Sequence, residues 1–216
     1  AFVFAREEGL RAVISGMGGR LSWLERPKDG FLLIKTSLLK DILRFDKANM
    51  TIELGSGMPL LGLDSFLEDH GLFFPLDPFD IKDLSLGGAY QTKAVGGLSL
   101  GFGHIRDLVL GMELKSPGIE RVHFGAHTIK NVSGYNLKRF LAGGFGEFGV
   151  VTRLILRVFP RPDAEMRLRI VPKSLDGLGG LAGLVGQESL GVSRALFVGA
   201  KGNDWPRLWV GFVGQG

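Results

Sequence analysis

The chain of 216 residues is 45% hydrophobic and 22% charged, a composition typical of a soluble globular protein with one full domain and part of a second. Its net charge of +4 comes from Lys and Arg scattered among Asp and Glu, and no basic run alternates with aromatic residues, which argues against nucleic-acid binding. The chain has no cysteine, which excludes disulfides and cysteine-ligated iron–sulfur clusters within it, and it has neither an apolar run of about 18 residues nor a signal-peptide pattern.

The first half of the chain predicts a short helix, several strands and a longer helix. Residues 2–9 are typical of the end of a helix with a glycine stop, so the chain is expected to lack its beginning. Apolar runs bounded by turn residues predict strands over 12–15 and 31–35 and a hairpin over 41–54 that turns at 46–49. A helix over about 59–69 follows, because Pro59 suits a first helical turn and Gly71 a position past the end.

The second half predicts a strand pair, a helix and a closing strand. Residues 107–115 and 120–124 are expected to pair around Ser116-Pro117-Gly118, followed by a helix over 135–141 and a strand over 150–159. Pro160-Arg161-Pro162 then interrupts the pattern, and the Gly- and Leu-rich residues after it have weaker periodicity. We therefore predict two domains, over residues 1–162 and 163–216.

Glycines cluster at three places where a phosphate could lie against bare backbone. The clusters are Gly16-Met17-Gly18-Gly19, the stretch from Gly87-Gly88 to Gly96-Gly97, and residues 143–149. Glycine permits positive φ and lets consecutive N–H groups converge on an anion. Three such loops in one domain predict a long nucleotide cofactor.

Two segments could be read as a Rossmann fingerprint, and neither fits well. Gly144-x-Gly146-x-x-Gly149 matches as a string, but it is predicted to follow a helix and precede a strand, which is the reverse of the required order. Gly55-Ser56-Gly57 follows a strand and precedes a helix, yet Leu60 stands where the third glycine should be. A strand-to-helix turn without cofactor contact is the interpretation favoured for this second segment.

Other chemistry-bearing residues give weak signals. His123 and His127 are four apart, a metal-binding spacing on a helix, but they lie at an expected strand end, so no metal is predicted. His104 and Tyr135 could contact a cofactor, or could be a solvent-facing loop residue and a core aromatic residue. No residue stands out as a general base, so the catalytic residues are unknown.

An ordered series of motifs resembles a known flavoprotein family. Ser85-Leu86-Gly87-Gly88-Ala89, then Gly96, then residues 103–111 resemble the second FAD-binding segment of the vanillyl-alcohol oxidase/PCMH superfamily. Residues 130–137, followed by 143–152 and Phe159-Pro160-Arg161-Pro162, are similar to the FAD-binding accessory subunit of glycolate oxidase. The resemblance covers about residues 1–162, and the series is more specific than any single motif.

The resemblance implies a fold, a cofactor and a set of contacts. The fold would be α+β, with a two-subdomain PCMH-type FAD-binding domain followed by part of an α+β cap domain. The first glycine loop has no histidine, so the FAD would be bound noncovalently. The positions matched to cofactor-binding positions of the family are Gly16, Met17, Gly18, Gly19, Arg20, Asp77, Pro78, Ser85, Gly87, Gly88, Thr92, Gly96, Gly103, Gly149 and Val150.

The resemblance also implies a function and partners. The leading hypothesis is the FAD-binding subunit of a 2-hydroxy-acid oxidising complex, acting on glycolate or a lactate-like acid. A catalytic flavoprotein subunit and an iron–sulfur subunit would accompany it, and the lack of cysteine here agrees with electrons leaving through a partner. Without an export signal the expected location is the cytoplasm, with any peripheral position at the inner membrane coming through partners.

Departures from the family pattern motivate two alternatives. Met17 stands where Gly is usual, Gly19 where Ser or Thr is usual, Lys93 where Asn is frequent, and Glu147 where Thr is usual. A glutamate beside a pyrophosphate would repel it unless its side chain turns to solvent. The chain could therefore be a structural or assembly subunit with a degenerate FAD site. A self-sufficient flavin-dependent oxidase or dehydrogenase is the other alternative.

Overall fold

The computed structural model of the protein describes residues 1–25, 27–125, 137–172, 175–187, 191–198 and 207–214. The chain folds into two compact units, and the second is built from three separate segments. Unit 1 comprises residues 1–74, 80–94 and 105–159, and unit 2 comprises residues 75–79, 95–104 and 160–216. Each unit is described by itself below.

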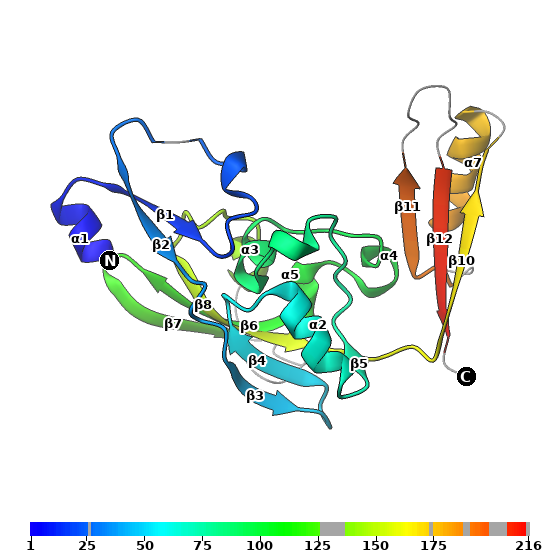
Figure 1. Cartoon of the computed structure of the whole chain (residues 1–216), viewed down its shortest axis with the longest axis horizontal. Helices are drawn as coiled ribbons and strands as arrows, with labels where there is room; N and C mark the ends of the chain where they lie inside the picture. The colour runs from blue at the N-terminus through cyan, green and yellow to red at the C-terminus, as the bar shows by residue number, and fades with distance from the viewer. Residues whose placement is uncertain (26, 126–136, 173–174, 188–190, 199–206, 215–216) are drawn as a thin grey trace. The chain divides into compact units, whose positions relative to one another are not determined.

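A five-stranded antiparallel sheet forms the centre of unit 1 (Figure 1). Its strands run in the order β3-β4-β8-β6-β7. Their bounds are β3 Ile42–Asp46, β4 Thr51–Gly55, β6 Val109–Ser116, β7 Ile119–Gly125 and β8 Val150–Arg157. Strands β4, β6 and β8 are mostly buried because they lie inside the sheet, and Leu54, Leu154 and Leu156 have no exposed surface.

The hairpin β3–β4 confirms the prediction made for this part of the chain. Its turn is closed by Asp46, whose Oδ1 accepts a hydrogen bond of 3.0 Å from the backbone N–H of Asn49. Asp and Asn favour turns because their short side chains can satisfy nearby backbone groups.

Short helices and strands complete unit 1. Helix α2 (Leu60–Glu68) buries Leu60, Leu63 and Leu67, which share one helical face. The remaining elements are α1 Phe2–Glu7, the 3-10 helices η1 Leu21–Trp23 and η2 Ile81–Asp83, α3 Leu86–Gln91, α5 Ile105–Leu108, α6 Leu137–Leu141 and β5 Leu72–Phe73, which pairs with β9 Phe159–Pro160.

A two-stranded parallel sheet carries the first glycine loop. Strand β1 (Arg11–Ser15) pairs with β2 (Phe31–Lys35) in the register Arg11 to Phe31 through Ser15 to Lys35. The loop begins directly after Ser15, which is buried and whose carbonyl accepts from the backbone N–H of Thr36 at 2.8 Å. The start of the loop is therefore fixed by β-sheet hydrogen bonds.

Unit 2 contains a three-stranded antiparallel sheet and a helix. The strands β10 (Ala164–Ile170), β12 (Arg207–Gly214) and β11 (Arg194–Val198) lie in that order, and α7 spans Leu175–Val185. Val192, Leu208 and Val210 form its buried core, against which Leu181 and Val185 of α7 pack. The short helix α4 (Ser99–Phe102) also belongs to this unit.

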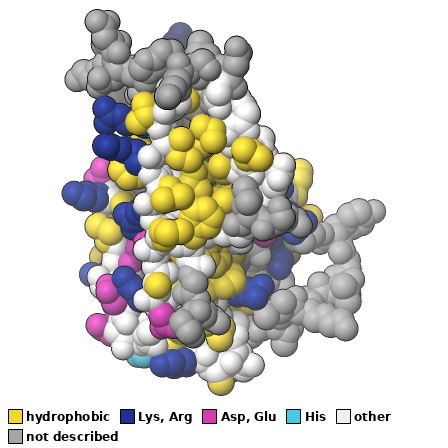
Figure 2. All heavy atoms as spheres, turned by 90° about the vertical axis from the view of Figure 1, so that its right-hand side faces the viewer, with side chains coloured by type: hydrophobic (Ala, Val, Ile, Leu, Met, Phe, Trp, Pro, Cys, Tyr) yellow, Lys and Arg dark blue, Asp and Glu magenta, His cyan; other side chains and the backbone are white. Residues whose placement is uncertain are grey.

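Hydrophobic side chains also occur on the surface. Met166 and Leu168 of β10 and Leu184 of α7 are between 44% and 56% exposed, so α7 does not cover all the apolar side chains of its sheet. Figure 2 shows hydrophobic side chains gathered on the face that it presents, beside Lys and Arg side chains. Within the described residues, no helix combines the length and the hydrophobicity needed to cross a bilayer.

Two predicted strands differ from the structure. The strand predicted from residue 107 begins at Val109, because residues 105–108 form helix α5, which buries Ile105 and Leu108 on one face three positions apart. The strand predicted over 150–159 ends at Arg157, since the backbone N–H of Val158 bonds the carbonyl of Met50 and the chain then starts β9.

Candidate functional site

One cavity in unit 1 is lined by residues from each of the three glycine clusters. Its lining consists of residues 14–21, 24, 36, 56, 83–85, 87–88, 91–92, 145–146, 149 and 151. These residues surround about 680 Å³ of space, part of which is open to solvent. We call this space the glycine cavity. It contains ten of the predicted cofactor positions, namely Gly16, Met17, Gly18, Gly19, Arg20, Ser85, Gly87, Gly88, Thr92 and Gly149.

The first glycine loop presents a row of unused backbone donors. Among the described residues, none of the five N–H groups of residues 16–20 donates a hydrogen bond to the protein. Backbone N–H groups are strong donors that normally find a partner. Consecutive free N–H groups beside a cavity form a site for an anion such as a phosphate.

Two glycines of this loop are required by its close contact with residues 83–85. A Cβ atom on Gly16 would stand 1.9 Å from Oγ of Ser85, and one on Gly19 would stand 2.5 Å from the carbonyl oxygen of Asp83. Gly18 has φ +93°, a conformation that side chains rarely adopt. The glycines thus let the loop approach its neighbour and turn, while its N–H groups stay free.

At the cavity, Gly87 and Gly88 of the second glycine loop already donate their N–H groups to other groups of the protein. Ser85 is the N-cap of α3 and its Oγ accepts from the backbone N–H of Gly88 at 3.2 Å. The backbone N–H of Gly87 bonds the carbonyl of Ser56 at 2.7 Å. We conclude that this loop shapes the cavity through its backbone packing and offers fewer donors than the first.

Arg20 connects the first glycine loop to residues 80–94 of unit 1, through Asp80 and Thr92. Its Nε and Nη2 donate to the two carboxylate oxygens of Asp80 at 2.6 and 2.7 Å, and its Nη1 donates to Oγ1 of Thr92. The Arg20 side chain is 11% exposed. Its hydrogen bonds to Asp80 hold the pKa of that carboxyl below its usual value, despite the opposing effect of burial.

Buried hydroxyl groups also line the cavity and were not predicted from the sequence. They belong to Ser15, Thr36 and Ser56, which are 1–6% exposed. The Oγ of Ser56 has no hydrogen-bond partner among the described residues. The turn at residues 55–57 does connect β4 to α2 as predicted, but it contributes to the cavity, which its sequence context did not indicate.

The other five predicted cofactor positions do not line the cavity, since four belong to unit 2 and one lies in the five-stranded sheet. Asp77, Pro78, Gly96 and Gly103 are in unit 2 and are not among the lining residues, and Val150 is buried at the start of β8. Their contact with a cofactor remains a prediction.

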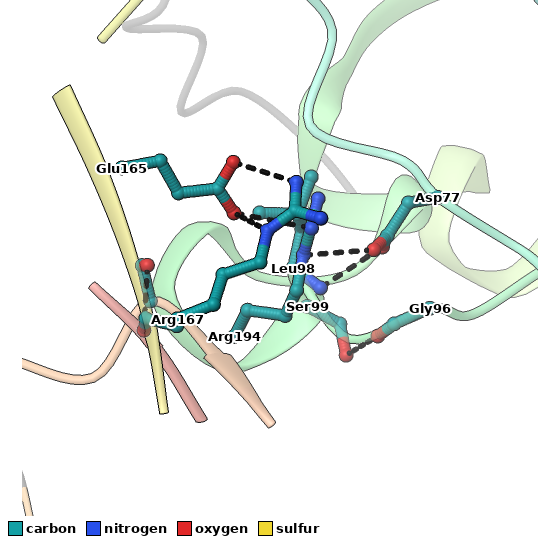
Figure 3. Close-up of polar contacts among 9 residues, drawn as sticks. Asp77, Gly96, Leu98, Ser99, Glu165, Arg167 and Arg194 are labelled. Atoms are coloured by element: carbon teal, nitrogen blue, oxygen red, sulfur yellow. Dashed lines mark hydrogen bonds and ion pairs between the residues drawn. The ribbon is translucent and has the colours of Figure 1, made fainter. Parts of the chain in front are cut away.

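Asp77 takes part in a polar network within unit 2 (Figure 3). Its Oδ1 accepts from the backbone N–H of Leu98 at 2.9 Å, and its Oδ2 lies 3.1 Å from Nε of Arg194. Nη1 of Arg194 reaches Oε1 of Glu165 at 3.1 Å, and Arg167 contacts both oxygens of the same glutamate. The network ties the loop at Asp77 to strands β10 and β11.

Met17 and Glu147, which depart from the family pattern and raised doubt about FAD binding, differ in where they lie. Met17 lines the cavity and is 44% exposed. Glu147 is exposed and is not a lining residue, whereas its neighbours Phe145, Gly146 and Gly149 are. Since Glu147 is exposed and does not line the cavity, the electrostatic argument against phosphate binding loses its support, and Met17 is the departure that lies in the site.

The other candidates from the sequence lie apart from the cavity lining. His104 is exposed in unit 2, and Nε2 of His123 lies 3.5 Å from Oε2 of the buried Glu113. His127, Tyr135 and residues 130–136 lie outside the described residues. In the part of the chain that the structure describes, no group of three His, Cys, Asp or Glu residues could hold a metal ion.

Comparison with known proteins identifies the relatives of the chain. The family model described as FAD binding domain matches residues 1–125. "Glycolate oxidase subunit GlcD" of Bacillus subtilis is 29% identical over 79% of this chain and 36% of its own length. "Glycolate oxidase subunit GlcE" of Escherichia coli is 31% identical over 73% of this chain and 45% of its own length. The chain therefore spans less than half the length of these curated relatives.

A solved structure shares the fold at low sequence identity. An alkyldihydroxyacetonephosphate synthase superposes on 99% of this chain and 44% of its own with a TM-score of 0.80 and 15% identity. This likeness confirms the α+β fold expected from the sequence.

Proposed function

Because the chain belongs to the FAD binding domain family, we propose that its glycine cavity binds FAD noncovalently and that it serves a 2-hydroxy-acid oxidoreductase. The row of free N–H groups at residues 16–20 is the observation that carries this proposal. FAD has a pyrophosphate, and an anion of that kind matches backbone donors that have no acceptor among the described residues.

The residues of the cavity fit the chemical character of FAD. The N–H groups of residues 16–20 would hold the pyrophosphate, and the hydroxyls of Ser15, Thr36 and Ser56 would face polar groups of the cofactor. Ile14 and Leu24 supply apolar surface for its ring systems. When bound, FAD supplies two-electron redox chemistry, while the protein sets its position and excludes water.

The side chains of the cavity support the proposal of noncovalent binding. The chain has no cysteine, and no histidine is among the residues that line the cavity. A side-chain link to the flavin would therefore need a residue outside this cavity. Retention of FAD rests on hydrogen bonds and packing.

The role as a subunit is supported by the relatives. Both GlcD and GlcE are named as subunits of glycolate oxidase. We propose that the protein works with a catalytic flavoprotein subunit and an iron–sulfur subunit, and that its substrate class is glycolate or a lactate-like acid. A chain without cysteine cannot build an iron–sulfur cluster with cysteine ligands, so a partner would carry electrons onward.

The visible absorption spectrum of the purified protein tests FAD binding. We expect a flavin spectrum that moves into the supernatant after denaturation and precipitation, with FAD identified by chromatography. A colourless protein that also fails to bind added FAD would leave the structural-subunit alternative in place.

A second experiment tests the substrate class. The flavin of the holoprotein, alone and with candidate partner subunits, is titrated without oxygen with glycolate and with D-lactate. Bleaching that requires the partners supports the subunit role. Turnover by the isolated protein with an artificial acceptor would instead favour the self-sufficient enzyme.

A further inference from the structure

Arg20 lies at the end of this row of backbone donors, and three of the five N–H donors of its guanidinium are already used within the protein. Nε and Nη2 bond the Asp80 carboxylate, and Nη1 bonds Thr92. The guanidinium carbon also lies 4.5 Å from the centre of the Trp23 ring. The two-point contact with the Asp80 carboxylate fixes the orientation of the guanidinium plane as well as its position.

We propose that Arg20 is a positioning residue that holds the first glycine loop in its anion-binding form, and that it does not bind the phosphate directly. This inference rests on the proposed binding of FAD in the glycine cavity. In it, the anion is bound by the N–H groups of residues 16–20, and Arg20 fixes the geometry of that loop against Asp80 and Thr92.

The hydrogen bonds form a continuous path between the first two glycine loops. Arg20 donates to Oγ1 of Thr92, and the Thr92 hydroxyl donates to the carbonyl of Gly88 at 2.7 Å. Gly88 in turn donates its N–H to Oγ of Ser85. Loss of the guanidinium would therefore loosen both walls of the cavity.

The net charge of the pair Arg20 and Asp80 also supports a positioning role for Arg20. The Asp80 carboxylate bonds Arg20 through both oxygens, so the pair presents little net positive charge to an anion. If Arg20 were a phosphate ligand, Asp80 would compete with the phosphate for the Nε and Nη2 donors and would neutralise the charge that attracts it. If Arg20 is a positioning residue, Asp80 supports binding, so the two roles predict opposite effects of removing Asp80.

The test compares the FAD affinity of the wild type with Asp80→Asn, Arg20→Lys and Arg20→Met, by titration of the flavin-free protein. We expect all three to weaken FAD binding on the order of tenfold, because each breaks the two-point contact. We expect Arg20→Met/Asp80→Asn to bind FAD no more weakly than Arg20→Met alone, since both substitutions remove the contact between Arg20 and Asp80.

Glu165→Gln is the matched control. Glu165 is also 31% exposed and also receives a two-point contact from an arginine, but it lies in unit 2 and does not line the cavity (Figure 3). It should leave the FAD affinity within about twofold of the wild type. Urea unfolding of the flavin-free variants adds a readout independent of the cofactor, and Arg20 and Asp80 should show coupling there.

The possible failures are distinguishable. If the wild type binds FAD and Asp80→Asn binds it as tightly or more tightly, Arg20 is a ligand held back by Asp80 and the inference is overturned. Full binding by Arg20→Lys would also overturn it, because only the charge would then matter. A wild type that binds no FAD removes the proposed function and this inference together.

Discussion

The contact between Gly16 and Ser85 gives a prediction that separates two reasons for a glycine in a cofactor loop. A Cβ at position 16 would stand 1.9 Å from Oγ and 2.9 Å from Cβ of Ser85. Ordinary contacts between heavy atoms are roughly 3.5 Å, so the overlap is about 1.5 Å at its worst. Ser85 is 1% exposed and caps α3, which leaves it little freedom to move away.

Gly16→Ala should therefore destabilise the flavin-free protein by about 1–3 kcal/mol, the usual cost of overpacking. That loss corresponds to roughly 2–4 °C in Tm for each kcal/mol in a chain of this size. The φ of Gly16 is outside the left-handed range, so no backbone strain adds to the loss. In a Ser85→Gly background the obstruction is gone, and a glycine N-cap costs only a few tenths of a kcal/mol.

The measurement is urea unfolding of the wild type, both single variants and the double variant. In the Ser85→Gly background, we expect Gly16→Ala to lower the free energy of unfolding only slightly, or to raise it by about 0.5 kcal/mol, because alanine restricts the unfolded chain. An equal cost of Gly16→Ala in both backgrounds would refute the steric argument. If stability recovers but FAD affinity does not, the new Cβ meets the cofactor itself.

Further predictions concern single residues around the cavity. Glu147→Thr should leave FAD retention unchanged, because Glu147 is exposed and outside the cavity lining; a clear gain by the same spectrum would contradict this. Lys93 has φ +48°, which asparagine tolerates better, so Lys93→Asn should raise the free energy of unfolding in urea by up to about 1 kcal/mol at unchanged slope. Ser56→Ala should not destabilise the flavin-free protein, because it removes a buried hydroxyl without a partner among the described residues; a loss above about 1 kcal/mol would show that this hydroxyl does make a hydrogen bond. Arg20 lowers the pKa of Asp80 in the folded state, so the pair stabilises the protein fully at pH values above 3.8, the pKa of Asp80 in the unfolded chain. This stabilisation is lost as the pH falls further, because Asp80 becomes protonated in the folded protein too. The unfolding free energies of the wild type and Asp80→Asn should therefore converge below about pH 4 in acid denaturation.

The sequence alone determined the family motifs and much of the local structure. Turn residues at 46–49, the pattern of Leu60, Leu63 and Leu67, and the glycines of the first loop each act within a few residues of themselves. Such signals are local, because a φ preference, a turn or a helical face needs no distant partner. The individual turns, helices and glycine loops were therefore predictable from local patterns, whereas the α+β class was predicted through the resemblance to the flavoprotein family.

Only the tertiary structure decided which groups in those loops are free and which are used. Arg20 meets Asp80 across 60 positions of the chain, and Ser56 enters the cavity from a turn that looked remote from it. The segments 75–79 and 95–104 join residues 160–216 in unit 2, although they stand inside the sequence of the first predicted domain. No local pattern encodes these contacts, because they arise from packing between segments that are distant in sequence.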